Sequence, residues 1–394
     1  MNLLEEAKKH YSEQIYSITA DLHAHPELSF EEKRTSAIIR AQLEKLGIEI
    51  LDLGLETGVV GLLRGRGDAT IALRADIDAI VQHEEYDRPD KSLTPGVMHG
   101  CGHDTHTAGL LKKRAWLSAG LSAAIGAAML LSAHRDELRA NVLFVFQPAE
   151  EKLKGAKYML EHNVFSQYKP SAVFGLHNLP ELPVGTVGVK AGPLMSFKDG
   201  FRIKFIGKSG HTSTPQKNVD PTVAIASLVM SLETIISRNV GPLESAVLTV
   251  CSIQSGTPFT TTIDDAEITG NIRSLEEDVR ERILKRVELM AHGTAEEFGC
   301  ACELELIPIT RGVFNSESLL KAASDAGAAV FGVENVKVPS VNMASEDFSL
   351  LSEGVPSFFY FLGSGVPGEK PYLWHNPMFH AAHDTPACGA ALLA

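Results

Sequence analysis

The order of strand-like and helix-like segments constrains the fold of this chain most. Through residue 184, helical patterns at 3–22 and 29–46 accompany short apolar strands expected at 59–63, 70–74, 141–146 and 172–176. Residues 64–68 predict a turn between the first two of these strands. Strands that alternate with helices favour a largely parallel sheet covered by helices on both faces. The pattern therefore predicts an α/β fold.

A different pattern occupies residues 185–306. It predicts a strand, a long helix at 220–238, two strands, a second long helix at 275–298 and a last strand, which together form a small α+β unit. Helix–strand alternation returns after this segment. We therefore expect an α/β domain built from residues 1–184 and 307–394, interrupted by an inserted α+β domain at 185–306.

Two S-x-x-E sequences predict where helices begin. Ser29 to Glu32 is typical of a capping box that opens the helix ending near Leu46, and Gly47 closes that helix. Ser274 to Glu277 predicts the same arrangement for the second long helix of the inserted segment. In both cases the serine and the glutamate would satisfy backbone N–H groups of the first helical turn.

Composition excludes several classes of protein. The 36 Lys and Arg against 49 Asp and Glu give a net charge of −13 without a basic block, so nucleic acid is not expected as a partner. Five cysteines, an odd number, do not form a disulfide framework, and the N-terminus lacks a secretory signal pattern, so we expect a cytoplasmic protein. The apolar run 115–133 is mostly Ala, Gly and Ser, which favours a buried helix over a membrane span.

Polar side chains gather where the expected strands end. The sequence RADID follows one strand at 74–78, QPAEE ends another at 147–151, and GLH ends a third at 175–177. A glycine-rich loop at 96–106 and the sequence WHNP at 374–377 add further histidines and a cysteine. Because the carboxyl ends of parallel strands converge on one crevice, we expect these groups to meet there.

The residue types in these motifs favour a metal site. Thiolate, imidazole and carboxylate are ligands of zinc and similar ions, and Cys101 and His103 can point to one side of an extended loop. Glu150 and Glu151 are adjacent, so one can bind metal while the other acts as a base, which is the equipment for hydrolysing an amide or ester. Taken singly, each motif also fits a structural role, and His380 and His383 compete with His375.

The motifs together resemble the metal-dependent amidohydrolase branch of the aminoacylase/carboxypeptidase-type metallopeptidases. This branch includes hippurate hydrolases, N-acetyl-diaminopimelate deacetylases and the enzymes that release auxin from amino-acid conjugates. The resemblance runs almost from end to end and is carried by these segments: LHAHPE at 22–27, RADIDA at 74–79, GVMHGCGHD at 96–104, FQPAEE at 146–151, FGLH at 174–177, GKSGH at 207–211, GNIR at 270–273, SEDF at 345–348 and WHNP at 374–377.

The resemblance implies a site for two divalent ions of manganese, zinc, nickel or cobalt. Its ligands would be Cys101 as the bridge, His103, Glu151, His177 and His375. Glu150 would be the general base for attack by a metal-bound hydroxide on the amide of an N-acyl amino acid. Asp76 would orient a ligand imidazole.

The resemblance also implies a role for the inserted domain as a lid and dimerisation module. It would supply His211 to the scissile carbonyl and Asn271 and Arg273 to the substrate carboxylate. The expected protein is a homodimer that acts on small molecules, without nucleic acid or membrane as partners. A dipeptidase or carboxypeptidase, and a catalytically impaired homologue that binds metal or ligand, are the alternatives.

Two segments depart from the family pattern. The stretch between His103 and Glu150 is longer by about one helix, around residues 109–123. After Pro377 the chain has FHAAHD at 379–384, where acidic residues are usual in the family. The second departure leaves open how His375 is supported.

Overall fold

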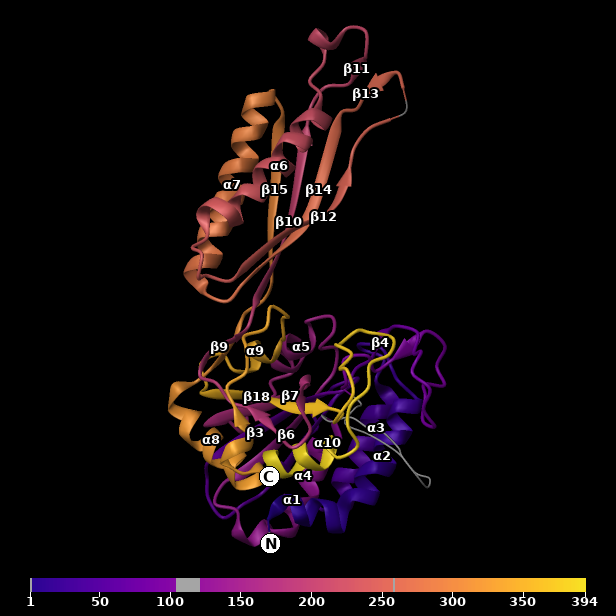
Figure 1. Ribbon diagram of the computed structural model, residues 1–394, viewed down its shortest axis with the longest axis vertical. Coiled ribbons are helices and arrows are strands. Elements are labelled where there is room, and N and C mark those ends of the chain that lie inside the picture. The colour runs from indigo at the N-terminus through magenta and orange to yellow at the C-terminus, as the bar shows by residue number, and fades with distance from the viewer. Residues whose placement is uncertain (1, 104–120, 258) are drawn as a thin grey trace. The chain divides into compact units, whose positions relative to one another are not determined.

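A computed structural model describes residues 2–103, 121–257 and 259–394 (Figure 1). These residues form two compact units. The first unit contains the described residues within 1–192, 314–340 and 347–394, and the second contains those within 193–313 and 341–346. The second unit thus starts at 193 rather than 185 and continues past 306, because β15 extends to Thr310 and a short return segment belongs to it.

The first unit contains an eight-stranded sheet with the order β1-β2-β6-β3-β7-β18-β8-β17. Strands β6, β3, β7 and β18 are parallel to one another, as expected for an α/β fold. The strands are β1 (Glu49–Ile50), β2 (Val59–Leu63), β3 (Thr70–Asp76), β6 (Asn141–Gln147), β7 (Ala172–Pro183), β8 (Val187–Gly188), β17 (Val336–Lys337) and β18 (Ser357–Gly365). Strands β2 and β3 are consecutive but not neighbours, since β6 lies between them.

Helices cover both faces of this sheet (Figure 1), with α4 and α10 on one side and α5 and α9 on the other. The helices of the unit are α1 (Leu3–Glu6), α2 (Ser12–Ala24), α3 (Lys33–Lys45), α4 (Leu121–Ala133), α5 (Gly155–Glu161), α8 (Glu317–Phe331), α9 (Phe348–Leu351) and α10 (Thr385–Leu393), and a π-helical turn, Ala7–Tyr11, links α1 to α2. Helix α4 is buried, as its composition predicts, and Gly126 lets it approach α10 closely: a Cβ there would lie 2.7 Å from that of Ala390. Residues 104–120, which hold most of the extra stretch, lie outside the described part.

The expected capping boxes do not form. Helix α3 begins at Lys33, and the carboxylate of Glu27 accepts the N–H groups of Arg34 and Thr35. Ser29 donates its hydroxyl to Asp78 instead of to the helix. In the second unit, α7 (Glu277–Phe298) has no side-chain cap, and the buried hydroxyl of Ser274 has no partner among the described residues.

The second unit is an antiparallel sheet with two helices on one face. Its order is β12-β14-β10-β15, formed by β10 (Phe197–Ile206), β12 (Ala246–Gln254), β14 (Asp265–Ser274) and β15 (Ala301–Thr310). Helices α6 (Pro221–Asn239) and α7 pack on it through Ile225, Leu228 and Val287. Among the described helices, α6 is the one that is long and apolar enough for a bilayer span by length and composition.

Short strands complete both units. In the first unit β4 (Ile80–Val81) pairs with β5 (Val97–Met98), and in the second β11 (Gly210–His211) pairs with β13 (Thr261–Thr262). Strands β9 (Gly192–Met195) and β16 (Val313–Asn315) lie where the chain passes from one unit to the other.

Candidate metal centre

Three neighbouring strands deliver polar groups to one edge of the large sheet. Asp76 ends β3 and is in register with Gln147, which ends β6. Arg74 of β3 is in register with Gly175 of β7, two residues before His177. The parallel strands therefore end side by side, as expected from the sequence, and the loops that follow them form the site.

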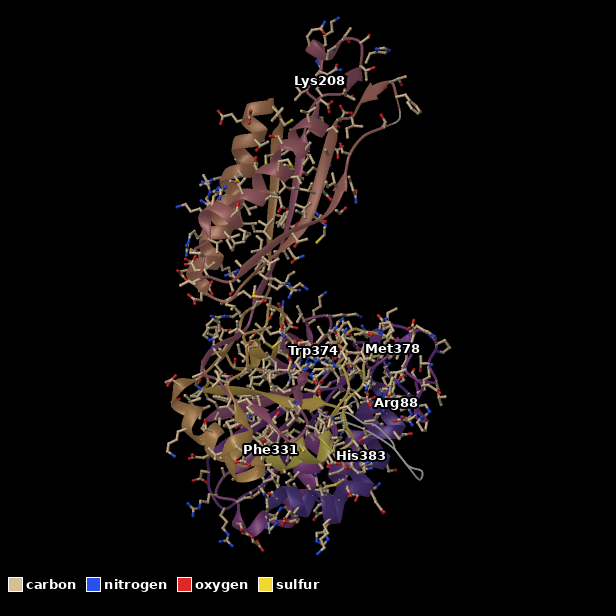
Figure 2. The ribbon with its side chains drawn as sticks, in the orientation of Figure 1. Arg88, Lys208, Phe331, Trp374, Met378 and His383 are labelled. Carbon is tan, nitrogen blue, oxygen red and sulfur yellow. The ribbon has the colours of Figure 1, made fainter. Side chains whose placement is uncertain are left out.

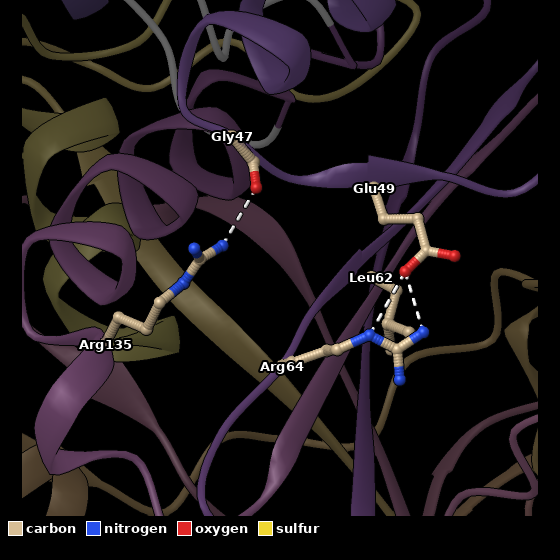
Figure 3. A pocket seen from close by; sticks show the side chains of 5 residues that line it. All are labelled: Gly47, Glu49, Leu62, Arg64 and Arg135. Atoms are coloured by element: carbon tan, nitrogen blue, oxygen red, sulfur yellow. Dashed lines mark hydrogen bonds and ion pairs between the residues drawn. The ribbon is translucent and has the colours of Figure 1, made fainter.

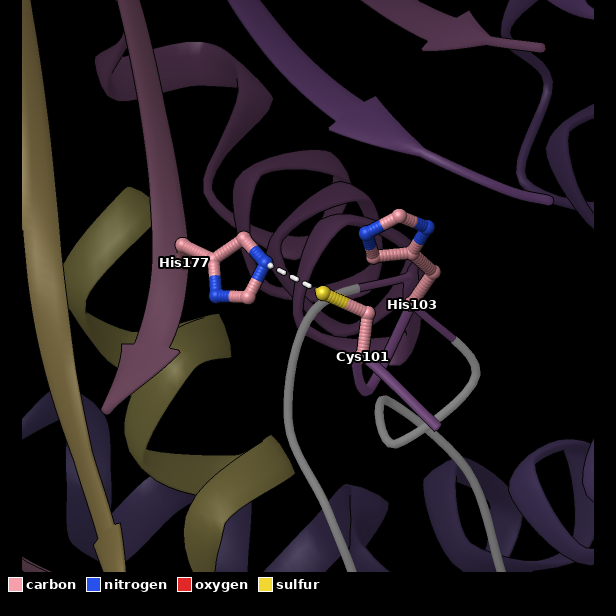
Figure 4. Close-up of side chains that lie close together, drawn as sticks. All are labelled: Cys101, His103 and His177. Atoms are coloured by element: carbon pink, nitrogen blue, oxygen red, sulfur yellow. Dashed lines mark hydrogen bonds between the residues drawn. The ribbon is translucent and has the colours of Figure 1, made fainter. Parts of the chain in front are cut away.

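Cys101, His103 and His177 are buried and close together (Figure 4). The Sγ atom of Cys101 lies 3.5 Å from Nε2 of His177. The Nδ1 atom of His177 lies 2.9 Å from the Asn178 carbonyl, and Nδ1 of His103 lies 3.0 Å from the Asp78 carbonyl. Each carbonyl accepts the proton of its imidazole, which leaves both Nε2 atoms as acceptors or metal ligands.

Two glutamates and a third histidine complete the cluster. Nε2 of His103 lies 3.8 Å from Oε2 of Glu150 and 3.9 Å from Oε1 of Glu151. Nε2 of His375 lies 3.3 Å from Oε2 of Glu151. The five expected ligands thus belong to overlapping groups of three, and within each group the donor atoms lie within 4.8 Å of one another.

The donor set fits a bound cation. Nε2 of His103 and Oε1 of Glu151 are buried and have no hydrogen-bond partner among the described residues. Unpaired buried donors and acceptors are costly unless an ion occupies the space between them. A thiol, imidazoles and carboxylates together are the ligand types of first-row divalent ions.

The electrostatics of the cluster point the same way. Burial raises the pKa of the Cys101 thiol well above its usual range, and the charges of Glu151 and Glu150 raise it further. Burial alone lowers the pKa of the His103 imidazole, but Asp76 and Asp78 overcome that effect and raise it. A divalent cation relieves this crowding of negative charge, since it favours both the thiolate and the neutral imidazole.

His375 is held by its neighbours in spite of the unusual C-terminal segment. Its backbone has φ of 60°, a strained value for a residue other than glycine, and its N–H donates to the Gly100 carbonyl at 2.7 Å. Trp374, labelled in Figure 2, donates its Nε1–H to the Asn178 carbonyl at 3.1 Å. These contacts fix the imidazole beside Glu151, although 53% of the His375 side chain is exposed.

The two competing histidines have other partners. His380 stacks on Tyr86 with ring centroids 4.0 Å apart and pairs with Glu369. His383 pairs with Asp384. Neither occurs in a group of potential ligands among the described residues.

The Nδ1 atom of the His103 imidazole is contacted by Asp78 rather than by Asp76. One oxygen of Asp78 lies 3.3 Å from Nδ1 of His103, and its two oxygens accept the N–H groups of Glu150 and Glu151 at 3.1 and 3.0 Å. Asp76 instead accepts from Arg74 at 2.8 Å and lies 3.7 Å from the other nitrogen of His103. The expected role of Asp76 in orienting a ligand imidazole stays a prediction. Both residues were in the same motif, but alternation along a strand end does not tell which one turns toward the imidazole.

The expected substrate residues lie in the second unit. Arg273 is in register with Lys198 and donates to the Met343 carbonyl at 2.8 Å, and the Asn271 amide contacts Sγ of Cys251 at 3.2 Å. His211 is exposed on β11, and its Nδ1 accepts from the Ser213 hydroxyl at 2.8 Å. The structure therefore places these three residues in one unit and five ligands with Glu150 in the other.

A separate pocket of about 220 Å³ lies at the edge of the large sheet (Figure 3). It is lined by Glu49, Arg64 and Arg135 among others. Arg64 pairs with Glu49 at 2.7 Å and Arg135 donates to the Gly47 carbonyl at 2.9 Å. Because both guanidinium groups are already engaged and none of the expected site residues lines it, this pocket is not the candidate site.

Comparisons with known proteins agree on one family. The model of peptidase family M20/M25/M40 matches residues 72–394. An N-acetylcysteine deacetylase of Bacillus subtilis is 40% identical over 95% of this chain and 93% of its own length, and an IAA-amino acid hydrolase of Arabidopsis thaliana is 35% identical over 94% and 82%. The crystal structure of a dinuclear metal-binding peptidase of the M20 family from Bacillus subtilis superposes with a TM-score of 0.80, at 34% identity, over 99% of this chain and 97% of that one.

Proposed function

Because this chain belongs to peptidase family M20/M25/M40, it is an amide-bond hydrolase, and we propose that it hydrolyses N-acyl amino acids with two divalent metal ions. The single observation that carries the proposal is the cluster at the strand ends. There the five potential ligands form overlapping groups, and Nε2 of His103, which has no hydrogen-bond partner among the described residues, lies 3.8 Å from the Glu150 carboxylate. The deacetylase and hydrolase relatives favour an acyl group attached to an amino acid.

The proposed chemistry divides the work among the residues of this chain. Two divalent ions would be held by Cys101, His103, Glu151, His177 and His375, and they would activate a water and polarise the scissile carbonyl. Glu150 takes a proton from that water and returns it to the leaving nitrogen. A protonated carboxyl group could not accept this proton, so Glu150 must be ionised at the start of the reaction.

The positions of Arg273 and His211 in the second unit suggest that a second copy of the chain completes the substrate site. Arg273 pairs with Lys198 near the start of β10, whereas His211 follows the end of β10 at Ile206. At about 3.3 Å per residue, Lys198 and Ile206 on β10 are separated by roughly 25 Å. One small acyl amino acid cannot contact both Arg273 and His211 in one chain, so we infer a homodimer in which His211 serves the partner's site. Exposed apolar residues of this unit, Met230 on α6 and Ile253 on the edge strand β12, suit such an interface.

Zinc, nickel, cobalt and manganese all suit the ligand set, and the thiolate favours the softer of them. All five cysteines lie among the described residues and are free. A reducing compartment, as in the cytoplasm, would preserve the Cys101 thiolate on which this site depends.

The test compares substrates and metal content on the same protein. Acetyl- and benzoyl-amino acids should be hydrolysed faster than dipeptides, and chelation should abolish turnover until a divalent ion is restored. Cys101→Ser should lose both metal and activity, while Cys251→Ser, at an exposed cysteine of the second unit, should retain its metal. Faster cleavage of dipeptides would favour the peptidase named among the structural neighbours, and bound metal without turnover of either class would favour the impaired homologue.

A further inference from the structure

The segment 29–32 contacts the loop that carries Glu150 at several points. The Ser29 hydroxyl donates to Asp78 at 2.6 Å, and Asp78 in turn accepts the N–H groups of Glu150 and Glu151. Lys152 donates its ammonium group to the Ser29 carbonyl at 3.1 Å. The ring of Phe30 packs edge-on against Tyr158. The sequence motif that resembles a capping box is therefore tied to the site loop.

Glu32 makes the most direct of these contacts. Its side chain is fully buried, does not cap α3, and accepts the N–H of Ala149 through Oε1 at 2.8 Å. Three successive N–H groups, of Ala149, Glu150 and Glu151, are thus bound by only two carboxylates, those of Glu32 and Asp78. None of these three N–H groups is used in a helix or a sheet, so the carboxylates fix the course of this loop.

Ala149 has a backbone conformation that needs such support. Its φ is 53°, in the left-handed region that a residue with a Cβ adopts only at a cost. This residue directly precedes Glu150, so its φ sets the direction in which the next residue leaves the strand end. Strain of this kind persists where surrounding contacts over-determine the backbone.

We propose that Glu32 is a positioning residue, which holds the left-handed turn at Ala149 by accepting its N–H and so places the Glu150 carboxylate over the metal cluster. Burying the carboxyl group of Glu32 costs free energy, and this cost supports a role for Glu32 beyond packing. Burial, followed by the charge of Asp78, raises the pKa of Glu32 to about 7, and Oε2 has no hydrogen-bond partner among the described residues. A protein that needed only to fill this space would be better served by an apolar side chain.

Two variants separate reach from charge. Glu32→Gln keeps the length and one acceptor oxygen, so it should keep turnover close to that of the wild type. Glu32→Asp keeps the acid but is one methylene shorter and cannot reach the Ala149 N–H. It should lower kcat by about 10–100-fold, the usual scale for residues that orient a metal site, with KM and metal content unchanged. The same pair of changes at the exposed neighbour Glu31 serves as control and should have no effect.

A second readout does not depend on the substrate. Hydrogen exchange of the amides of residues 149–153 in metal-loaded protein should be faster in Glu32→Asp than in the wild type and in Glu32→Gln, while exchange in α3 stays unchanged. The kinetic readout rests on the proposed function, but this one does not, so a wrong substrate class and a wrong role for Glu32 are distinguishable. Full turnover of Glu32→Asp, equal losses in both variants, or loss of metal would each overturn the proposal.

Discussion

Asp78 in the first unit and Asp199 in the second are both buried, and the two carboxylates are used in opposite ways. Asp78, 1% exposed in the first unit, accepts from a serine, from two backbone N–H groups of the Glu150 loop, and contacts a ligand imidazole. Asp199, 2% exposed in the second unit, receives two parallel bonds at 2.7 Å from the single side chain of Arg280. The first carboxylate organises other groups, whereas the second is neutralised by one partner.

The difference extends to the candidate site residues. In the first unit they are mostly buried and fixed to one another before any substrate arrives. In the second unit His211 is exposed on a short β-ribbon and Arg273 is half-buried. A metal site must be assembled in advance to bind an ion tightly, whereas a contact that strengthens in the transition state can wait for substrate. Removal of a residue from either unit should therefore have different consequences.

The largest effect on kcat is expected when Glu150, the proposed general base, is replaced. Glu150→Gln should lower kcat by about 10²–10⁴-fold, because an amide cannot accept the proton of the attacking water. Metal content should be retained, since the five ligands are untouched. Turnover at saturating substrate and metal per chain are the measurements, with Glu31→Gln as the matched change at an exposed site. A Glu150→Gln enzyme with near-normal kcat would assign the base elsewhere.

A smaller loss of kcat is expected when His211 of the second unit is replaced. His211→Ala should lower kcat by about 10²–10³-fold, the scale for removing one hydrogen-bond donor to a developing oxyanion. Folding and metal content should stay normal, because the only hydrogen bonds of the His211 imidazole among the described residues are with Ser213 in its own loop. The change Thr214→Ala in the same exposed loop is the control.

Mixing of two inactive proteins tests whether His211 acts in the partner. Heterodimers of His211→Ala and Glu150→Gln chains contain one site with an intact base and an intact partner histidine. Activity should therefore rise well above that of either parent after subunit exchange. Equal activity before and after exchange would mean that His211 serves its own chain, and loss of metal from His211→Ala would make it a ligand.

The sequence predicted the site better than it predicted the supports of the site. The ligand set of Cys101, His103, Glu151, His177 and His375 is implied by the family resemblance, and the expected convergence of strand ends explains only why such groups can meet. Ser29 and Glu32 were assigned to a helix cap, since local spacing cannot tell whether a side chain bonds its own helix or a distant loop. The choice between Asp76 and Asp78, and the position of β6 between β2 and β3, likewise depend on tertiary pairing.

The smallest expected effect comes from replacing Asp78 and Asp199, which compares these two buried aspartates directly. Asp78→Asn replaces a carboxylate with four contacts by an amide whose NH₂ group faces one of two donors, the N–H of Glu150 at one oxygen position or the N–H of Glu151 at the other. The imidazole of His103 and the Glu150 loop should both be less well oriented, and metal affinity should fall by about 10–100-fold. Asp199→Asn weakens one ion pair with Arg280 and should cost about 2 kcal/mol of stability without changing metal affinity. Competition titrations with a chelating dye measure the first quantity and urea unfolding the second. Equal metal affinity in the two variants would mean that Asp78, like Asp199, serves only to balance charge in its own unit.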